Sequence, residues 1–289
     1  MKTNNPLVSI VITTIGQREI RKAIDSVLNS SYKNFELIVV NDGAKINLTE
    51  KGFCLINQEH KGLAAARNTG IKKAKGEIIA FIDDDAVAEK NWLKEIVSSF
   101  VSAEIGAVSG KSIEYFEGKT TENRLWVCNK FGLIKVNPKK LEKNDFIVLH
   151  GCNMALSKKV LQKVNFEDEN FIFYFDEIDL SWRIQKAGFK IAVNPNAIVR
   201  HFIKSNARFG NKFGFGKFKY YFALKNFNSL FFLPLLLLND FPFLLNDLKR
   251  SFQDLLKKKL SLKGFLIEFY SIFAGRVFGT GKAFIDLIK

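Results

Sequence analysis

The sequence predicts an α/β protein in which a doubly wound, mostly parallel sheet is followed by a helical extension. Strand and helix signals alternate from residue 1 to about 115, and this alternation is typical of a parallel sheet with helices on both faces. After about residue 205 the composition becomes basic and rich in phenylalanine. With 289 residues, 47% of them hydrophobic, the chain has room for one large domain and an appendage.

The individual elements follow from the periodicity of the apolar residues. Short apolar runs with β-branched or aromatic side chains predict strands, and apolar residues three or four positions apart predict helices. The expected strands are residues 7–12, 35–40, 52–56, 77–82, 146–149 and 197–200. The expected helices are residues 18–28, 62–74 and 90–103, a short one from 157, and one from about 176 to 187. In such sheets, ligands bind beyond the carboxyl ends of the strands.

Three consecutive aspartates, Asp83, Asp84 and Asp85, follow the apolar strand at residues 77–82. Three negative charges at one strand end repel one another unless a cation neutralises them. Oxygen ligands favour Mg2+ or Mn2+, and these ions commonly accompany phosphorylated substrates. The triplet therefore indicates a divalent metal site, and a polar turn that happens to hold three aspartates is the alternative.

Other polar side chains are expected at the same edge of the sheet. Thr13 and Thr14 end the first strand with Arg18 beyond them, Asp42 ends the second strand, and Arg67 lies on the next helix. A carboxylate such as Asp42 can accept from a base or ribose, and an arginine can face a phosphate. Because the sequence has neither a Gly-x-Gly-x-x-Gly fingerprint nor a Walker A loop, dinucleotide oxidoreductases and P-loop enzymes lose support.

The second half of the chain contributes a cluster of acids and a histidine. Asp176, Glu177 and Asp179 stand at the start of a predicted helix, where acidic residues also favour the helix dipole. Two adjacent carboxylates after an aromatic run equally suit a general base, because apolar surroundings raise a carboxylate's proton affinity. His201 ends a predicted strand, and such a histidine is either a core residue or a ligand.

Taken in order and spacing, these motifs resemble the family-2 glycosyltransferases of the GT-A fold. The resemblance rests on Thr13-Thr14 with Arg18, Asn41-Asp42-Gly43, the segment from Gly62 to Gly70, and the aspartate triplet, and it continues to about Ser205. It implies an inverting enzyme with a nucleotide-sugar donor. Thr13, Thr14, Arg18, Asp42, Arg67, Asp83 and Asp84 would then bind the donor, with Asp42 near the base and Arg67 near the nucleotide.

The same resemblance assigns the remaining site residues. Glu177 matches the family's general base, with Asp176 as the reserve. Asp179, Gly151 and Asn153 would lie on the acceptor side. His201 opens a His-x-x-x-Ser element and would join Asp83 and Asp85 as a metal ligand, which favours Mn2+ without excluding Mg2+.

The resemblance also divides the chain into domains. Residues 1–205 would form the GT-A catalytic domain, with a nucleotide-sugar half at 1–115 and an acceptor half at 116–205, and residues 206–289 a helical, membrane-associating extension. Residues 204–289 carry fifteen Lys and Arg against five Asp and Glu, within a chain of net charge +15. Basic and aromatic residues suit an anionic lipid surface or nucleic acid, and because no nucleic-acid-binding motif is present, we expect lipid and no nucleic acid.

Two helical segments of the extension are expected to mediate this contact. Residues 230–238 are apolar but too short to span a bilayer, since a proline and an aspartate interrupt and end the run. The amphipathic face formed by Leu244, Leu248, Phe252, Leu255 and Leu256 is predicted to lie on lipid or to pack on the catalytic domain, and a helix at 265–278 to do either.

Cysteine usage and the start of the chain predict the compartment. Three widely spaced cysteines indicate a reducing environment, and the residues before the first strand lack the apolar core of a signal peptide. The expected location is therefore the cytoplasm, at the inner face of the cell membrane.

The sequence thus predicts a metal-dependent inverting glycosyltransferase that acts on a hydroxyl of a cell-surface glycan or lipid-linked acceptor. A polyprenyl-phosphate sugar synthase is the alternative within the same class. A nucleotidyltransferase and a basic nucleic-acid-binding protein are the alternatives from other classes.

Overall fold

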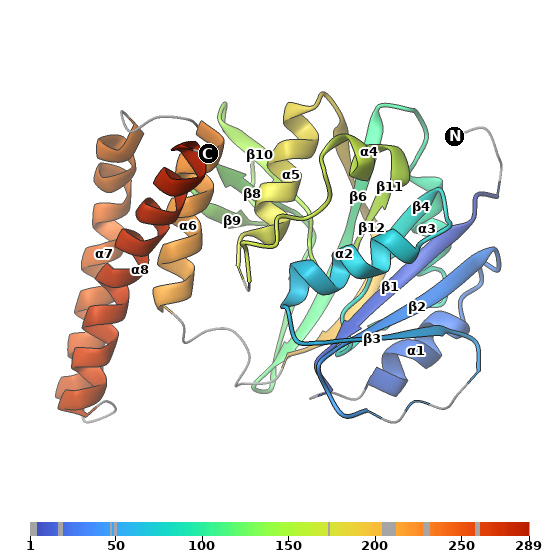
Figure 1. The fold of residues 1–289 in the computed structure, drawn as a ribbon, viewed down its shortest axis with the longest axis horizontal. Coiled ribbons are helices and arrows are strands. Elements are labelled where there is room, and N and C mark those ends of the chain that lie inside the picture. Colours follow the sequence, from blue (N-terminus) through green and yellow to red (C-terminus); the bar gives the residue numbers. More distant parts are fainter. Residues whose placement is uncertain are drawn as a thin grey trace. The chain divides into compact units, whose positions relative to one another are not determined.

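The structure is a computed structural model that describes residues 5–16, 20–46, 48, 51–172, 174–203, 212–227, 232–257 and 261–288 (Figure 1). The chain forms two compact units. The first contains Met1–Val127 and Lys135–Ser205, and the second contains Cys128–Ile134 and Asn206–Lys289.

The first unit is built on a nine-stranded mixed sheet with the strand order β3-β2-β1-β4-β11-β6-β12-β5, and β7 pairs with β6. The first four strands in this order are parallel, so their carboxyl ends share one edge. The strands are β1 (Val8–Thr14), β2 (Phe35–Asp42), β3 (Cys54–Gln58), β4 (Ile78–Phe81), β5 (Ala86–Ala88), β6 (Ile105–Phe116), β7 (Lys119–Asn123), β11 (Met154–Ser157) and β12 (Lys190–Phe202). A second sheet has the order β10-β8-β9, formed by β10 (Asp145–Val148), β8 (Trp126–Asn129) and β9 (Ile134–Val136).

Helices cover both faces of the large sheet because its strands are apolar on both sides. In β1, Ile10 and Ile12 pack with α1 (Ile20–Leu28) and α3 (Trp92–Ser98), whereas Val11 packs with helices on the opposite face. The helices on that opposite face are α2 (Leu63–Lys73), α4 (Lys158–Lys163) and α5 (Asp176–Lys186). The predicted α/β fold with a mostly parallel sheet is confirmed.

The structure departs from the predicted elements mainly in the centre of the sheet. The four-residue strand β11 lies antiparallel between β4 and β6, and neither β6 nor β11 was expected from the sequence. The predicted strand at 197–200 is the end of the longer β12, whose register shifts between Asn194 and Ile198. The predicted helix at 90–103 is shorter, because α3 ends at Ser98.

The second unit contains three helices, α6 (Lys212–Phe227), α7 (Phe232–Leu256) and α8 (Leu262–Ile288). The apolar segment and the amphipathic helix that the sequence separated are one helix, α7, with Pro242 inside it. Asp240 of α7 is buried within this unit, where it accepts hydrogen bonds from Lys219 on α6 and, at 2.5 Å, from Arg276 on α8. Of the helices within the described ranges, none is long and apolar enough to cross a membrane.

The predicted lipid-facing stripe of α7 is not a single exposed face. Leu244, Leu248 and Leu255 are half-buried, whereas Phe252 and Leu256 are exposed. Two polar residues of α7, Asp240 and Ser251, are buried instead. The exposed apolar side chains of α7 and α8 are Leu237, Leu238, Phe241, Phe243, Leu245, Phe252, Leu256, Leu262, Leu266, Ile267, Phe269, Tyr270, Phe273, Val277 and Phe278, which we call the outer apolar surface.

Candidate functional site

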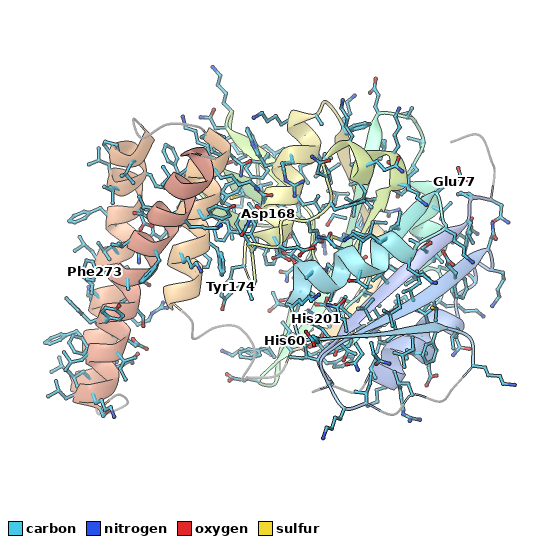
Figure 2. All side chains as sticks on the ribbon, in the orientation of Figure 1. His60, Glu77, Asp168, Tyr174, His201 and Phe273 are labelled. Atoms are coloured by element: carbon cyan, nitrogen blue, oxygen red, sulfur yellow. The ribbon has the colours of Figure 1, made fainter. Side chains whose placement is uncertain are left out.

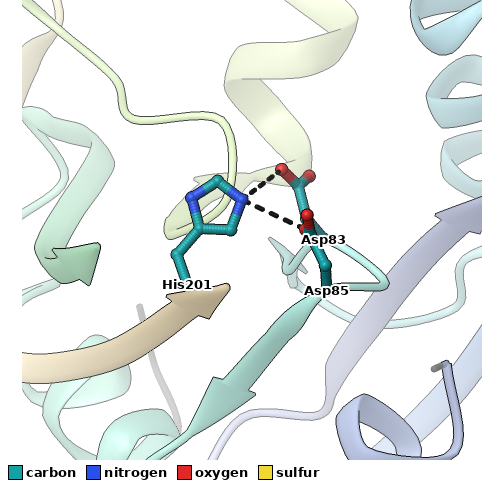
Figure 3. Close-up of side chains that lie close together, drawn as sticks. All are labelled: Asp83, Asp85 and His201. Carbon is teal, nitrogen blue, oxygen red and sulfur yellow. Dashed lines mark hydrogen bonds and ion pairs between the residues drawn. The ribbon is translucent and has the colours of Figure 1, made fainter. Parts of the chain in front are cut away.

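Asp83, Asp85 and His201 form a compact group at the carboxyl edge of the sheet (Figure 3), and Figure 2 shows where His201 lies in the fold. The triplet follows β4, and β12 brings His201 opposite it because His201 pairs with Ala86 in β5. His201 Nε2 lies 3.1 Å from Asp85 Oδ1 and 3.7 Å from Asp83 Oδ2. The three side chains are buried, and one ligand atom from each lies within 4.8 Å of the others.

This group fits a divalent metal ion by its donor chemistry. Two carboxylate oxygens and one imidazole nitrogen suit Mn2+ or Mg2+, and their mutual distances permit a shared ion. Burial lowers the pKa of His201, but Cys152, Asp85 and Glu114 nearby raise it well above the usual range.

Asp84 turns toward the first strand. Thr14 Oγ1 donates a hydrogen bond to Asp84 Oδ2, and the Gly16 backbone N–H donates to Thr14 Oγ1 at 3.0 Å. Thr13 alternates with Thr14 along β1 and so faces the other side of the sheet. Arg18, the other residue predicted beside this strand, lies outside the described residues.

Asp42 holds the loop that leads into α2. Its carboxylate is 3% exposed and accepts hydrogen bonds from the backbone N–H groups of Lys61 at 2.8 Å and Gly62 at 2.9 Å. His60 Nδ1 lies 2.9 Å from Asp42 Oδ2, and Gln58 Nε2 donates to Oδ1 at 2.8 Å. Asp42 thus shapes the edge where the donor is predicted to bind, and its contact with the nucleotide base stays a prediction.

Arg67 links the metal group to the predicted base. Its guanidinium is 1% exposed, and Nη1 lies 3.0 Å from Asp176 Oδ2 and 3.4 Å from Glu177 Oε1. Nη2 lies 3.7 Å from Asp83 Oδ1 and donates to the Gly151 carbonyl oxygen at 3.2 Å. In this structure the guanidinium therefore faces carboxylates from both halves of the site, and its predicted contact with the nucleotide stays untested.

The carboxylates around Arg67 outnumber its single positive charge. Burial and the neighbouring Glu177 raise the pKa of Asp176 well above its usual range, although Arg67 opposes this. Burial also raises the pKa of Glu167, which lies 3.5 Å from Arg67 Nη1, to about 7. Burial in this cluster therefore favours the protonated forms of Asp176 and Glu167 over their ionised forms.

Glu177 is the more accessible member of the predicted acid pair. Its side chain is 18% exposed, whereas that of Asp176 is 1% exposed. Phe175 precedes the pair in the left-handed region, with φ of 69°, and so turns the chain sharply into α5. Gly151 packs against Glu177 so closely that a Cβ there would lie 1.9 Å from Glu177 Oε1.

Asn153 and Asp179 bind groups of the protein itself. Asn153 is fully buried, its Oδ1 accepts from Trp92 Nε1 at 2.8 Å, and its Nδ2 donates to two backbone carbonyls. Asp179 Oδ2 accepts from Arg183 Nε at 2.7 Å, and Arg183 in turn donates to the Phe166 carbonyl. Both residues thus position the elements around the site, and their place on the acceptor side stays a prediction.

Glu167 is a site residue that the sequence analysis missed. Asn68 holds it, because Asn68 Nδ2 donates to the Glu167 carbonyl and Asn68 Oδ1 accepts from the Glu167 backbone N–H, both at 3.0 Å. Glu167 lies in a segment without a recognisable pattern. Only its burial and its distance from Arg67 identify it.

Comparisons with known proteins agree with this geometry. Residues 9–164 match the family described as glycosyl transferase family 2. An uncharacterized glycosyltransferase of Rickettsia prowazekii (strain Madrid E) is 30% identical over 196 residues, which cover 61% of this chain and 58% of that protein. The pre-mycofactocin glycosyltransferase of Mycobacterium tuberculosis (strain ATCC 25618 / H37Rv) is 25% identical over 183 residues, covering 60% of this chain and 39% of that protein. The chain therefore spans less than two thirds of the length of either relative.

Solved structures share the fold. The mannosyltransferase PcManGT from Pyrobaculum calidifontis, in complex with GDP-Man and Mn2+, has a TM-score of 0.60 at 16% identity and covers 98% of this chain and 88% of its own. GalNAc-T7 with UDP, GalNAc and Mn2+ has a TM-score of 0.59 at 17% identity and covers 78% and 51%. Because the family match spans more than half of the sequence and includes the aspartate triplet, the chain belongs to glycosyl transferase family 2.

Proposed function

We propose that the protein is a metal-dependent inverting glycosyltransferase that transfers a sugar from a nucleotide-sugar donor to a hydroxyl of a cell-surface glycan or lipid-linked acceptor. One observation carries this proposal. The guanidinium of Arg67 contacts both Asp83, which belongs to the buried group suited to a metal, and the more accessible carboxylate of Glu177. The solved structures with GDP-Man and Mn2+, or with UDP and Mn2+, support a nucleoside diphosphate donor and a manganese ion.

The residues would divide the chemistry as follows. Asp83, Asp85 and His201 would hold Mn2+ or Mg2+, which supplies charge stabilisation for the departing nucleoside diphosphate. Glu177 would take the proton from the attacking acceptor hydroxyl on the opposite side of the sugar, so the anomeric configuration inverts. Arg67 would orient Glu177, because its guanidinium contacts that carboxylate and is itself fixed by the Gly151 carbonyl.

The metal assignment is tested by calorimetric titration of UDP and of GDP in the presence and absence of Mn2+. We expect Asp85→Ala and His201→Ala to abolish the metal-dependent part of the affinity. Asp25→Ala, at an exposed position of α1, is the matched control and should bind as wild type does. Unchanged metal-dependent affinity in both site variants would exclude this metal site.

The base assignment is tested by Glu177→Gln and Asp176→Asn, which preserve shape but remove the carboxylate. Glu177→Gln should keep donor affinity near that of wild type while kcat falls by roughly two to four orders of magnitude. If Glu177→Gln turns over normally and Asp176→Asn is inactive, the base is Asp176. Screening nucleotide sugars for metal-dependent turnover identifies the sugar and the nucleotide.

We further propose that residues 206–289 dock on the anionic inner face of the cell membrane, with the catalytic residues in the cytoplasm. The outer apolar surface supports insertion into the acyl boundary, and the exposed Lys249 and Arg250 on α7 support attraction to anionic lipid. Cosedimentation with neutral and anionic vesicles tests this. Leu238→Asn and Phe241→Asn should weaken binding, whereas Val101→Asn, at an exposed residue of the first unit, should not. Equal binding to both vesicle types would contradict electrostatic docking.

A further inference from the structure

Glu114 lies between two of the three histidines of the chain. Its Oε1 atom is 3.3 Å from His150 Nε2 and 3.8 Å from His201 Nδ1. The sheet creates this arrangement, because β6 and β12 are parallel neighbours and their register pairs Glu114 directly with His201. His201 therefore has the carboxylates of Asp83 and Asp85 near its Nε2 atom (Figure 3) and the carboxylate of Glu114 near its Nδ1 atom.

The two nitrogens of His201 have different surroundings. Nε2 faces Asp83 and Asp85, whereas Nδ1 is buried and, among the described residues, makes no hydrogen bond. A neutral imidazole carries one N–H, and a nitrogen that binds a metal must be the unprotonated one. If Nε2 is the ligand atom, the proton sits on Nδ1 and points toward Glu114. A movement of less than about 1 Å would bring Nδ1 and Oε1 to hydrogen-bond distance.

Glu114 is itself held in place by His150. The His150 ring stacks on Trp126 with centroids 4.8 Å apart and planes inclined by 23°. Cys152 Sγ also lies 3.8 Å from His150 Nε2. The carboxylate of Glu114 is consequently anchored at one histidine while it faces the other.

We propose that Glu114 is a positioning residue for the metal site: it accepts a hydrogen bond from His201 Nδ1–H and so fixes the ring with Nε2 directed at Asp83 and Asp85. This inference rests on the proposed function, because it takes His201 as the metal ligand. Carboxylates behind metal-binding histidines typically contribute 10- to 100-fold to metal affinity.

The test compares Glu114→Met, which keeps the length of the side chain but has no acceptor oxygen, with Glu114→Gln, which retains one. We expect Glu114→Met to weaken Mn2+ binding, measured with Mn2+ alone and with Mn2+ plus UDP, by 10- to 100-fold. Glu114→Gln should restore most of the affinity. Glu122→Met, on the adjacent strand β7, is the control, because Glu122 is half-exposed and pairs with Arg124. UDP affinity without metal should be the same in all four proteins.

A second measurement reports directly which nitrogen of the His201 ring carries the proton. Long-range 1H–15N correlation of the three histidines, at a Mg2+ concentration that just saturates wild type, should show His201 protonated only at Nδ1 in wild type. In Glu114→Met at the same Mg2+ concentration, a second set of His201 signals from metal-free protein, without this fixed tautomer, should appear. The inference is wrong if His201 carries its proton on Nε2, or if Glu114→Met binds Mn2+ as tightly as wild type does. If wild type itself binds no Mn2+, the proposed metal site fails first, and this inference fails with it.

Discussion

Gly151 leaves no room for a side chain next to Glu177, and this leads to a quantitative prediction for Gly151→Ala. The added methyl carbon would lie 1.9 Å from Glu177 Oε1 and 2.8 Å from Arg67 Nη2. Since ordinary contact begins at 3.4 Å, the carboxylate oxygen must move by about 1.5 Å. Misplacing a catalytic group by 1 Å can cost about 100-fold, so we expect kcat to fall by at least about 100-fold.

The fold should tolerate this change. Both clashing atoms are at the ends of long side chains, and Glu177 can swing toward solvent because it is 18% exposed. The free energy of unfolding should therefore fall by only about 1–3 kcal/mol, as is typical of overpacking. Metal-dependent binding of UDP or GDP should persist, since none of the metal ligands is altered.

The assay is steady-state turnover of the donor identified by screening, together with urea denaturation and calorimetric nucleotide binding. Gly281→Ala on α8 is the matched control, because nothing lies within 4 Å of a Cβ there. A Gly151→Ala protein with wild-type kcat would refute the assignment of Glu177 as the base. A protein that fails to bind the nucleotide would show that the methyl group disrupts more than Glu177.

Three further predictions concern stability. Arg67→Met leaves the surrounding buried carboxylates without their counter-charge and should lower the free energy of unfolding by about 3–5 kcal/mol in urea melts at pH 7. Burial raises the pKa of Glu167 from 4.5 to about 7, so its protonated form contributes stability that is complete below pH 4.5 and is lost as pH rises through 7. Urea melts at pH 5 and pH 8 should accordingly show wild type losing stability relative to Glu167→Gln on going to pH 8, and a pH-independent difference would contradict the raised pKa. Asp240→Asn should cost about 3–5 kcal/mol because Lys219 and Arg276 lose their shared carboxylate, and an unchanged melt would show that this cluster contributes nothing.

Much of the first unit could be predicted because its signals are local. The strands β1, β2, β3 and β4 are short apolar runs, and each is followed by polar residues that mark its carboxyl end. Parallel strands joined by helices then have few possible arrangements. The aspartate triplet could be placed at the sheet edge for the same reason, and the resemblance to the family supplied His201 as its partner.

The rest of the site depends on contacts that no local pattern encodes. Asp176 lies 109 positions from Arg67 in the sequence, yet their side chains are 3.0 Å apart. Glu114 could not be identified because β6 was not predicted. It acquires His201 as a neighbour through the pairing of β6 with β12, and His150 comes from the segment just before β11, which pairs with β6 on its other side.

By itself, then, the sequence determined the parallel half of the sheet, the edge that carries the aspartate triplet and the family, because alternation, strand ends and motif spacing are properties of neighbouring residues. Only the tertiary structure decided that Arg67 faces carboxylates, that Asn153 and Asp179 bind the protein itself, that Glu114 lies beside His201 and that Glu167 lies beside Arg67. The physical reason is that burial and charge pairing depend on which strands become neighbours. The antiparallel insertion of β11 between β4 and β6, for example, joins the two halves of the sheet, and its four residues carry no signal for that position.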